Sequence, residues 1–312
     1  QFNTTYEKTR LMFHRVVVAV ALAVGVRGQC PSNWAPEKCL GSSGKLGSRA
    51  VETTGDVRWD AGMGGHSHYE VDPKKTALLV IDPQMVYGAC PTNLTVEALV
   101  KPPSAPDFEG QSPLCCEKFY ESVANQNALA EAFRQNGGTV VVVAHVYRDV
   151  DGDGAVDNCG RICDFDVLGW AGWPKAWNLW NEAMPWSQVA FKTPEDPQGF
   201  EADPTQDYYL EKSTYSAMTD ALVTKLHDLE VDTIVVTGFM AQYCSVTTSR
   251  HAHDLGFKVI YVQDANDGPI LPQLLSGIDE NAAIPLYLGI AVADVTQTSD
   301  LLGALNKKND EL

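Results

Sequence analysis

The chain has 312 residues, 45% of them hydrophobic, and its 40 acidic and 23 basic side chains give a formal net charge of −17 at pH 7. A chain of this length buries one substantial core, which favours a single catalytic domain. The negative charge would repel nucleic-acid phosphates and anionic membrane surfaces, so it argues against both partners.

Residues 1–29 are predicted to be an upstream extension and a secretory signal peptide. An apolar run over residues 16–26 follows Arg15 and ends before Arg27 and Gly28. The run is too short to cross a bilayer, and its basic start suits a cleavable segment that begins at Met12. The alternative is a buried helix, but the run lacks amphipathic spacing. We therefore expect no membrane contact after signal cleavage.

Residues 307–312 form a tail that is close to an endoplasmic-reticulum retrieval signal. The tail ends with Asn309, Asp310, Glu311 and Leu312. Asn93, followed by Leu94 and Thr95, forms a glycosylation sequon. With the signal-like start, these features favour the secretory pathway, with the lumen of the endoplasmic reticulum preferred over secretion.

Eight cysteines fit an oxidising compartment. The spacing allows bridges from Cys30 to Cys39, from Cys90 to either Cys115 or Cys116, and from Cys159 to Cys163. Connectivity does not follow from spacing alone. Because Cys244 is a candidate reactive thiol, an odd number remains and at least one of these cysteines stays unpaired.

The remaining chain divides into an irregular N-terminal extension over residues 30–74 and one domain over residues 75–306. Short apolar runs predict strands at residues 76–81, 139–144, 233–237, 258–262 and 287–290. Helices are expected at residues 117–135, 216–229, 245–255 and 270–282. This alternation predicts a three-layer α/β/α sandwich with a mostly parallel, doubly wound sheet.

Residues 149–207 resemble a long functional insertion rich in Gly, Pro and Trp. Its five tryptophans stand at positions 170, 173, 177, 180 and 186. Tryptophans at this density are more often packing residues than ligand contacts, and both interpretations stay open.

An acidic run at the start of this insertion has the spacing of a calcium loop. Its candidate ligands are Asp149, Asp151, Asp153 and Asp157. Gly160 stands where such a loop needs a bidentate Glu, so an acidic turn tied by Cys159 and Cys163 is the competing interpretation. We expect no required cofactor and allow a structural calcium ion.

Three residues are candidates for chemistry because of their positions relative to the strands. Asp82 follows the first strand, at the edge where open α/β sheets place ligands, although it could simply cap the turn. Cys244 follows the strand at 233–237 just before a helix, where backbone amides favour thiolates and oxyanions. Lys212 would stabilise both charges if it lay between them.

The segments 76–84, 211–218 and 238–244, continuing through Thr248, Arg250 and Gly256, resemble the isochorismatase-like hydrolases. The resemblance covers residues 75–300 and carries the ordered trio Asp82, Lys212 and Cys244. That family includes nicotinamidases, N-carbamoylsarcosine amidases, ureide hydrolases and isochorismatases on a three-layer α/β/α fold. Its members commonly form homo-oligomers, which implies the same here.

By this resemblance Asp82 is the general base, Lys212 the electrostatic partner and Cys244 the nucleophile. It also implies a cis peptide between Phe239 and Met240, with the amides of Met240 and Cys244 binding the oxyanion. Substrate contacts are expected from Gln84, Tyr87, His145, Tyr215, Phe239 and Tyr243. For His145 an ordinary packed loop histidine is the alternative.

The resemblance also separates the possible reactions. Nicotinamidases bind a metal through an Asp-x-His motif, whereas this chain has Arg148 and the acidic run there, so a histidine-ligated zinc site is not expected. Vinyl-ether cleavage needs protonation rather than a thiol, so Cys244 favours hydrolysis of a small amide or ureide. The alternatives are a vinyl-ether hydrolase using Asp82 and Lys212, and a non-catalytic binding protein on the same fold.

Overall fold

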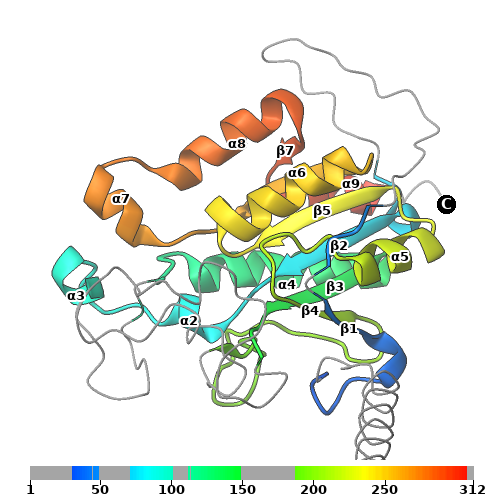
Figure 1. Cartoon of the computed structure of the whole chain (residues 1–312), viewed down its shortest axis with the longest axis horizontal. Coiled ribbons are helices and arrows are strands. Elements are labelled where there is room, and N and C mark those ends of the chain that lie inside the picture. Colours follow the sequence, from blue (N-terminus) through cyan, green and yellow to red (C-terminus); the bar gives the residue numbers. More distant parts are fainter. Residues whose placement is uncertain are drawn as a thin grey trace, which may run out of the picture.

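The computed structural model describes residues 30–43, 45–48, 71–100, 112, 114–148 and 187–307 (Figure 1). The predicted signal peptide, the acidic run, Cys159 and Cys163, the five tryptophans of the insertion and the C-terminal tetrapeptide lie outside these residues. Within them, no helix combines the length and apolar character needed to cross a membrane.

A parallel sheet of seven strands organises the described residues, in the order β1-β4-β3-β2-β5-β6-β7. The strands are β1 (Cys39–Ser43), β2 (Thr76–Ile81), β3 (Thr139–His145), β4 (Tyr208–Lys212), β5 (Thr233–Gly238), β6 (Lys258–Asn266) and β7 (Asp294–Thr296). Each pair of neighbours is parallel. The central strand β2 is buried at every position because helices cover both faces.

Two helical layers complete the sandwich. The helices are α2 (Met85–Gly88), α3 (Val96–Val100), α4 (Phe119–Gln135), α5 (Asp220–Asp228), α6 (Val246–Asp254), α7 (Ile270–Ser276), α8 (Glu280–Ala291) and α9 (Thr298–Lys307). Side chains of α4 and α9 pack with Leu78 and Val80, whereas those of α5, α6 and α8 pack with Leu79 and Ile81 (Figure 1). Alternate side chains of β2 therefore pack into the hydrophobic cores on opposite faces of the sheet. The predicted α/β/α fold is confirmed.

Local signals explain where several helices begin and end. Thr219 caps α5 by accepting a hydrogen bond from the Leu222 amide, so this helix begins after residue 216, where it was expected. Gly277, with φ of +73°, ends α7 in a left-handed conformation. The single helix expected over residues 270–282 is therefore two helices, α7 and α8.

The prediction of a strand at residues 287–290 is wrong, because these residues belong to α8. Asp279 caps this helix through the Ala282 amide, and Ile284 and Leu288, four residues apart, face the core. An apolar run of this length does not distinguish a helix from a strand without its cap. The last strand is the short β7.

The stretch predicted to be an irregular extension also differs at one point, since Cys39–Ser43 form edge strand β1 beside β4. A disulfide joins Cys39 to Cys30, with a Cα–Cα distance of 5.9 Å. A second disulfide joins Cys90 to Cys115, and Cys116 is a buried free cysteine. The open choice between Cys115 and Cys116 thus falls on Cys115 in the structure.

The end of β5 has no room for a side chain at Gly238. Its φ is +124°, and a Cβ atom would lie 2.0 Å from the carbonyl oxygen of Ile81. Backbone contacts this close require glycine, because neither strand can move without breaking the sheet. The approach holds the chain against β2 just before the turn that carries Cys244.

We predict that Gly238→Ala lowers the free energy of unfolding by more than about 3 kcal/mol or abolishes soluble expression. The matched control is Gly303→Ala in α9, where nothing lies within 4 Å of the added Cβ atom. That change should stabilise the helix by about 0.5–1 kcal/mol. Equal unfolding midpoints for the two variants would show that the close approach at Gly238 is relaxed in solution.

Candidate active site

Four neighbouring strands bring four polar side chains to the carboxyl edge of the sheet. Lys212 and His145 are the last residues of β4 and β3 and are paired in register, and Asp82 directly follows β2. Cys244 lies in a π-helical turn, Ala241–Ser245, between β5 and α6. The strand order β4-β3-β2-β5 therefore gathers residues that are up to 162 positions apart in the sequence.

The ammonium of Lys212 is the centre of this group. Its Nζ lies 2.8 Å from Asp82 Oδ2, 3.1 Å from His145 Nδ1 and 3.3 Å from Cys244 Sγ. The side chains of Lys212 and Asp82 are fully buried as an ion pair. The three residues of the predicted trio thus lie within hydrogen-bonding reach, and His145 joins them.

Asp82 combines an unusual backbone with a free acceptor atom. Its φ is +49°, a conformation that residues other than glycine rarely adopt, and its amide donates to the carbonyl of Val143. Oδ2 pairs with Lys212, whereas Oδ1 has no hydrogen-bond partner among the described residues. An unpartnered buried carboxylate oxygen beside a thiol is suited to accept the thiol proton.

Burial dominates the electrostatics of the group. It raises the pKa of Asp82, although the charge of Lys212 opposes the shift, and so makes this carboxylate a stronger base than usual. Burial likewise raises the pKa of Cys244 despite Lys212. For Lys212, burial is the largest influence and lowers the pKa, but the charges of Asp82 and Cys244 together raise it. The contact of Asp82 Oδ2 with the Lys212 ammonium favours the carboxylate, and the raised pKa of Cys244 favours a neutral thiol.

This result refines what the helix N-terminus predicted for Cys244. The position before α6 favours a thiolate, but Cys244 is only 1% exposed and its burial raises the pKa of the thiol. Consequently the thiol must lose its proton during attack rather than beforehand. The geometry provides a base, Asp82, that can accept this proton; it does not provide a preformed thiolate.

The turn that carries Cys244 is anchored from behind by Asp267. The peptide between Phe239 and Met240 is cis, as the resemblance implied. The amide of Ala241 donates to the carbonyl of Asp267, whose carboxylate accepts from the Lys118 amide and the Asn281 side chain. Burial raises the pKa of Asp267 to about 6. The nucleophile therefore sits on a turn supported by a second buried carboxyl group.

The residues expected to contact substrate fall into different environments. Gln84 is fully buried, and its side-chain amide forms hydrogen bonds with the backbone of His145 and Ser187. Its polar atoms are therefore already occupied and not directed at substrate. Tyr87 and Phe239 are also buried and stack on each other, with ring centroids 5.9 Å apart. For these three residues the structure supports packing and positioning instead of substrate contact.

Tyr215 and Tyr243 fit the expectation better. Their rings are 39% and 46% exposed, with centroids 5.6 Å apart, and the Tyr215 ring lies 6.3 Å from that of His145. Tyr147, which the sequence analysis missed, packs edge-on against His145 at 4.8 Å. It stands two residues after His145, and this alternation along an extended segment was the signal for it. The three tyrosines form an aromatic rim beside the buried group.

Asp82, His145 and Cys244 are also potential metal ligands, since their ligand atoms lie within 4.8 Å of one another. The ammonium of Lys212 lies within hydrogen-bonding distance of all three. Arg148, at the position where nicotinamidases have their metal motif, forms an ion pair with Glu211. Lys212 and Arg148 are thus paired with Asp82 and Glu211.

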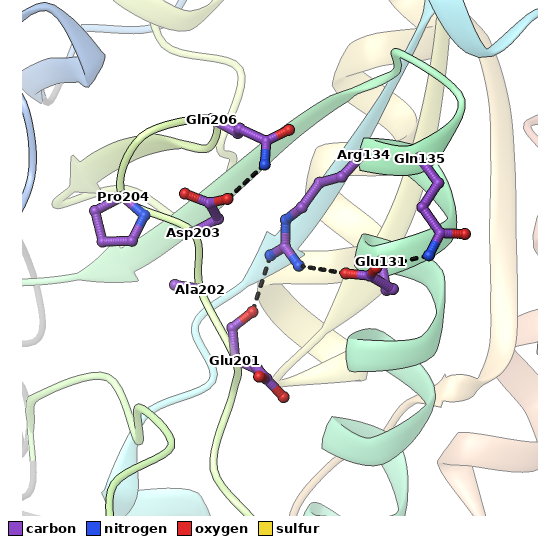
Figure 2. A pocket seen from close by; sticks show the side chains of 8 residues that line it. All are labelled: Glu131, Arg134, Gln135, Glu201, Ala202, Asp203, Pro204 and Gln206. Carbon is purple, nitrogen blue, oxygen red and sulfur yellow. Dashed lines mark hydrogen bonds and ion pairs between the residues drawn. The ribbon is translucent and has the colours of Figure 1, made fainter.

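A separate polar hollow of about 390 Å³ lies at the other end of α4, near the amino ends of β3 and β4 (Figure 2). Its central residue, Arg134, is neutralised by Asp207, at 2.8 Å, and by Glu131. Figure 2 shows Arg134 in contact with Glu131 and with the backbone carbonyl of Glu201. The hollow thus lies at the opposite edge of the sheet from Cys244, and its cation is already paired.

Comparisons with known proteins agree with this geometry. A model of the Isochorismatase domain matches residues 76–269, well over half of the chain. The chain belongs to the isochorismatase family. It is thus a hydrolase of this family, and the matched segment contains Asp82, His145, Lys212 and Cys244.

Solved structures share the fold at low identity. A cysteine hydrolase from Pseudomonas syringae pv. phaseolicola 1448A is 22% identical, with a TM-score of 0.57, over 77% of this chain and 96% of that one. A putative isochorismatase from Burkholderia xenovorans LB400 is 21% identical, with a TM-score of 0.50, over 76% and 89%. A search of curated protein sequences finds no match to this chain.

We predict that Asp267→Asn removes a part of the pH dependence of stability. Because the pKa of Asp267 in the folded state is raised to about 6, folding favours the protonated carboxyl group. This contribution to the free energy of unfolding is complete below pH 4 and is lost as the pH rises through 6, by up to about 3 kcal/mol. The substituted amide fits, because Asn281 can rotate its unpartnered Oδ1 towards it. Denaturant unfolding of both proteins at pH 4.5 and 7.5 measures this effect. The free energy of unfolding of the variant should increase relative to that of the wild type between pH 4.5 and pH 7.5. A difference that is the same at both pH values contradicts the raised pKa of Asp267.

Proposed function

We propose that the chain hydrolyses a C–N bond of a small amide or ureide through a covalent intermediate on Cys244. The observation that carries this proposal is the shared contact of Lys212 Nζ with Asp82, at 2.8 Å, and Cys244, at 3.3 Å. One ammonium there compensates the carboxylate before proton transfer and the thiolate after it. The total charge of the group does not change when the proton moves.

The first half of the reaction transfers the acyl group to sulfur. Asp82 Oδ1 accepts the thiol proton as Cys244 Sγ attacks the carbonyl carbon, and the amides of Met240 and Cys244 donate to the oxyanion. The C–N bond then breaks, and the proton held by Asp82 passes to the leaving nitrogen. The products of this half are an amine, or ammonia, and a thioester.

The second half regenerates the enzyme. Asp82 accepts a proton from water as the water oxygen attacks the thioester carbon, and the C–S bond breaks. The proton returns to sulfur, and the carboxylic acid leaves. Lys212 stays protonated throughout, because its raised pKa keeps the ammonium available to whichever neighbour is negative.

The substrate class follows from the surroundings of the thiol. Around the buried group are the rings of Tyr147, Tyr215 and Tyr243, which suit a planar acyl or ureide group. No free cationic side chain among the described site residues is left to bind a carboxylate, since Lys212 and Arg148 are paired. We therefore propose an uncharged, planar small molecule.

A panel of small amides and ureides tests this proposal with Cys244→Ala, Asp82→Asn and Lys212→Met. Each variant should lose roughly 10³-fold or more in kcat/KM on the substrate that the wild type hydrolyses. The matched control is Cys116→Ala, which removes the other buried free thiol among the described residues and should keep wild-type activity.

Intact-protein mass spectrometry during turnover separates this chemistry from its alternatives. The wild type should carry the mass of the acyl group on Cys244, and Cys244→Ala should not. Vinyl-ether hydrolysis through Asp82 and Lys212 would instead be seen as turnover of a vinyl-ether substrate such as isochorismate, unchanged in Cys244→Ala and with no adduct. A binding protein without catalysis would turn over nothing in the panel, and either result contradicts the proposal.

A further inference from the structure

We propose that His145 is a positioning residue of this centre: its neutral imidazole accepts the third proton of the Lys212 ammonium through Nδ1 and so holds the ammonium between Asp82 and Cys244. The proposal rests on the proposed function only for its consequence in catalysis. It replaces the expectation that His145 contacts substrate directly.

The donor and acceptor count carries the argument. An ammonium has three N–H donors and no acceptor, so Nδ1, 3.1 Å from Nζ, must be the acceptor in this contact. Asp82 Oδ2 and Cys244 Sγ take the other two protons. Because Lys212 is 1% exposed, no water would replace a lost acceptor without opening the site. Without His145, one N–H of a buried cation would lack a partner, a costly state.

The position of His145 is fixed independently of its ring. Gln84 bridges it: Oε1 accepts from the His145 amide at 3.2 Å, and Nε2 donates to the His145 carbonyl at 2.9 Å. The register of β3 and β4 pairs His145 with Lys212. The side chains of His145 and Lys212 therefore extend from adjacent strand ends. Gln84, two residues after Asp82, holds the backbone of His145 in place.

The alternative role, a base for the thiol, fits the distances less well. His145 Nδ1 lies 3.9 Å from Cys244 Sγ, longer than its 3.1 Å to Lys212 Nζ, and one lone pair cannot accept from both. The charged or titratable groups that face the ring are Lys212, Asp82, Cys244, Tyr147 and Tyr215. Burial and the charge of Lys212 lower the pKa of His145, which keeps the ring neutral.

Nitrogen NMR of the wild type tests the tautomer directly. An acceptor Nδ1 requires the proton on Nε2, so the ¹⁵N shifts of His145 should be those of a neutral Nε2–H imidazole from pH 5 to pH 8. The signal is assigned by its loss in His145→Asn. A protonated Nδ1, or an imidazolium within this range, would overturn the proposal without involving any substrate.

A pair of variants tests the effect on the thiol. His145→Asn can place its Oδ1 near the position of Nδ1, whereas His145→Phe fills the space without an acceptor. We expect His145→Phe to lower the rate of Cys244 alkylation by chloroacetamide at pH 7 by about tenfold, because the ammonium then stabilises the thiolate that forms during attack less well. His145→Asn should recover most of the lost rate.

Thermal unfolding establishes that both variants fold before they are compared. Equal alkylation rates at pH 7 for the wild type and His145→Phe would overturn the proposal, as would no recovery in His145→Asn. If His145→Phe does not fold, the tautomer of His145 measured by NMR in the wild type tests the proposal by itself. Failure of the proposed function is seen separately, as absence of turnover on the amide and ureide panel with the alkylation effects unchanged.

Discussion

The buried ammonium of Lys212 is the interaction on which the rest of this site depends. It lies among a carboxylate oxygen, an imidazole nitrogen and a thiol sulfur, all within 3.3 Å. Removing a cation and a carboxylate from water costs several kcal/mol each, and their attraction offsets this only with good geometry. The site is therefore stable only where the surrounding fold holds all partners in place.

The sheet supplies that geometry by joining rigid strand ends. His145 and Lys212 are register partners, Gln84 bridges from the chain after β2 to the backbone of His145, and Asp267 holds the turn of Cys244. None of these supports involves a flexible surface side chain. The arrangement also explains why a thiol with a raised pKa suits the chemistry: its proton moves to a neighbouring base while the cation stays still.

Much of this was predictable because the strands are short apolar runs and parallel strands end at one edge. β2 matches its predicted bounds, and Asp82 and Cys244 meet Lys212 as the ordered motif implied. The strand that carries Lys212, β4, was not predicted. The strand predicted at residues 287–290 failed because its apolar run belongs to a capped helix, α8. The role of Gln84 escaped prediction because it depends on which backbone groups its amide reaches. Tyr147 escaped because its only signal was its spacing of two residues from His145.

A double-mutant cycle on unfolding free energy at pH 7 tests the central claim most directly. Lys212→Met should destabilise the protein by about 3–5 kcal/mol, because Asp82 is then buried without its counter-ion. Adding Asp82→Asn should recover at least about 2 kcal/mol relative to the sum of the two single changes. Single effects that add within about 0.5 kcal/mol would mean that the two groups do not share a buried contact, and would contradict the account.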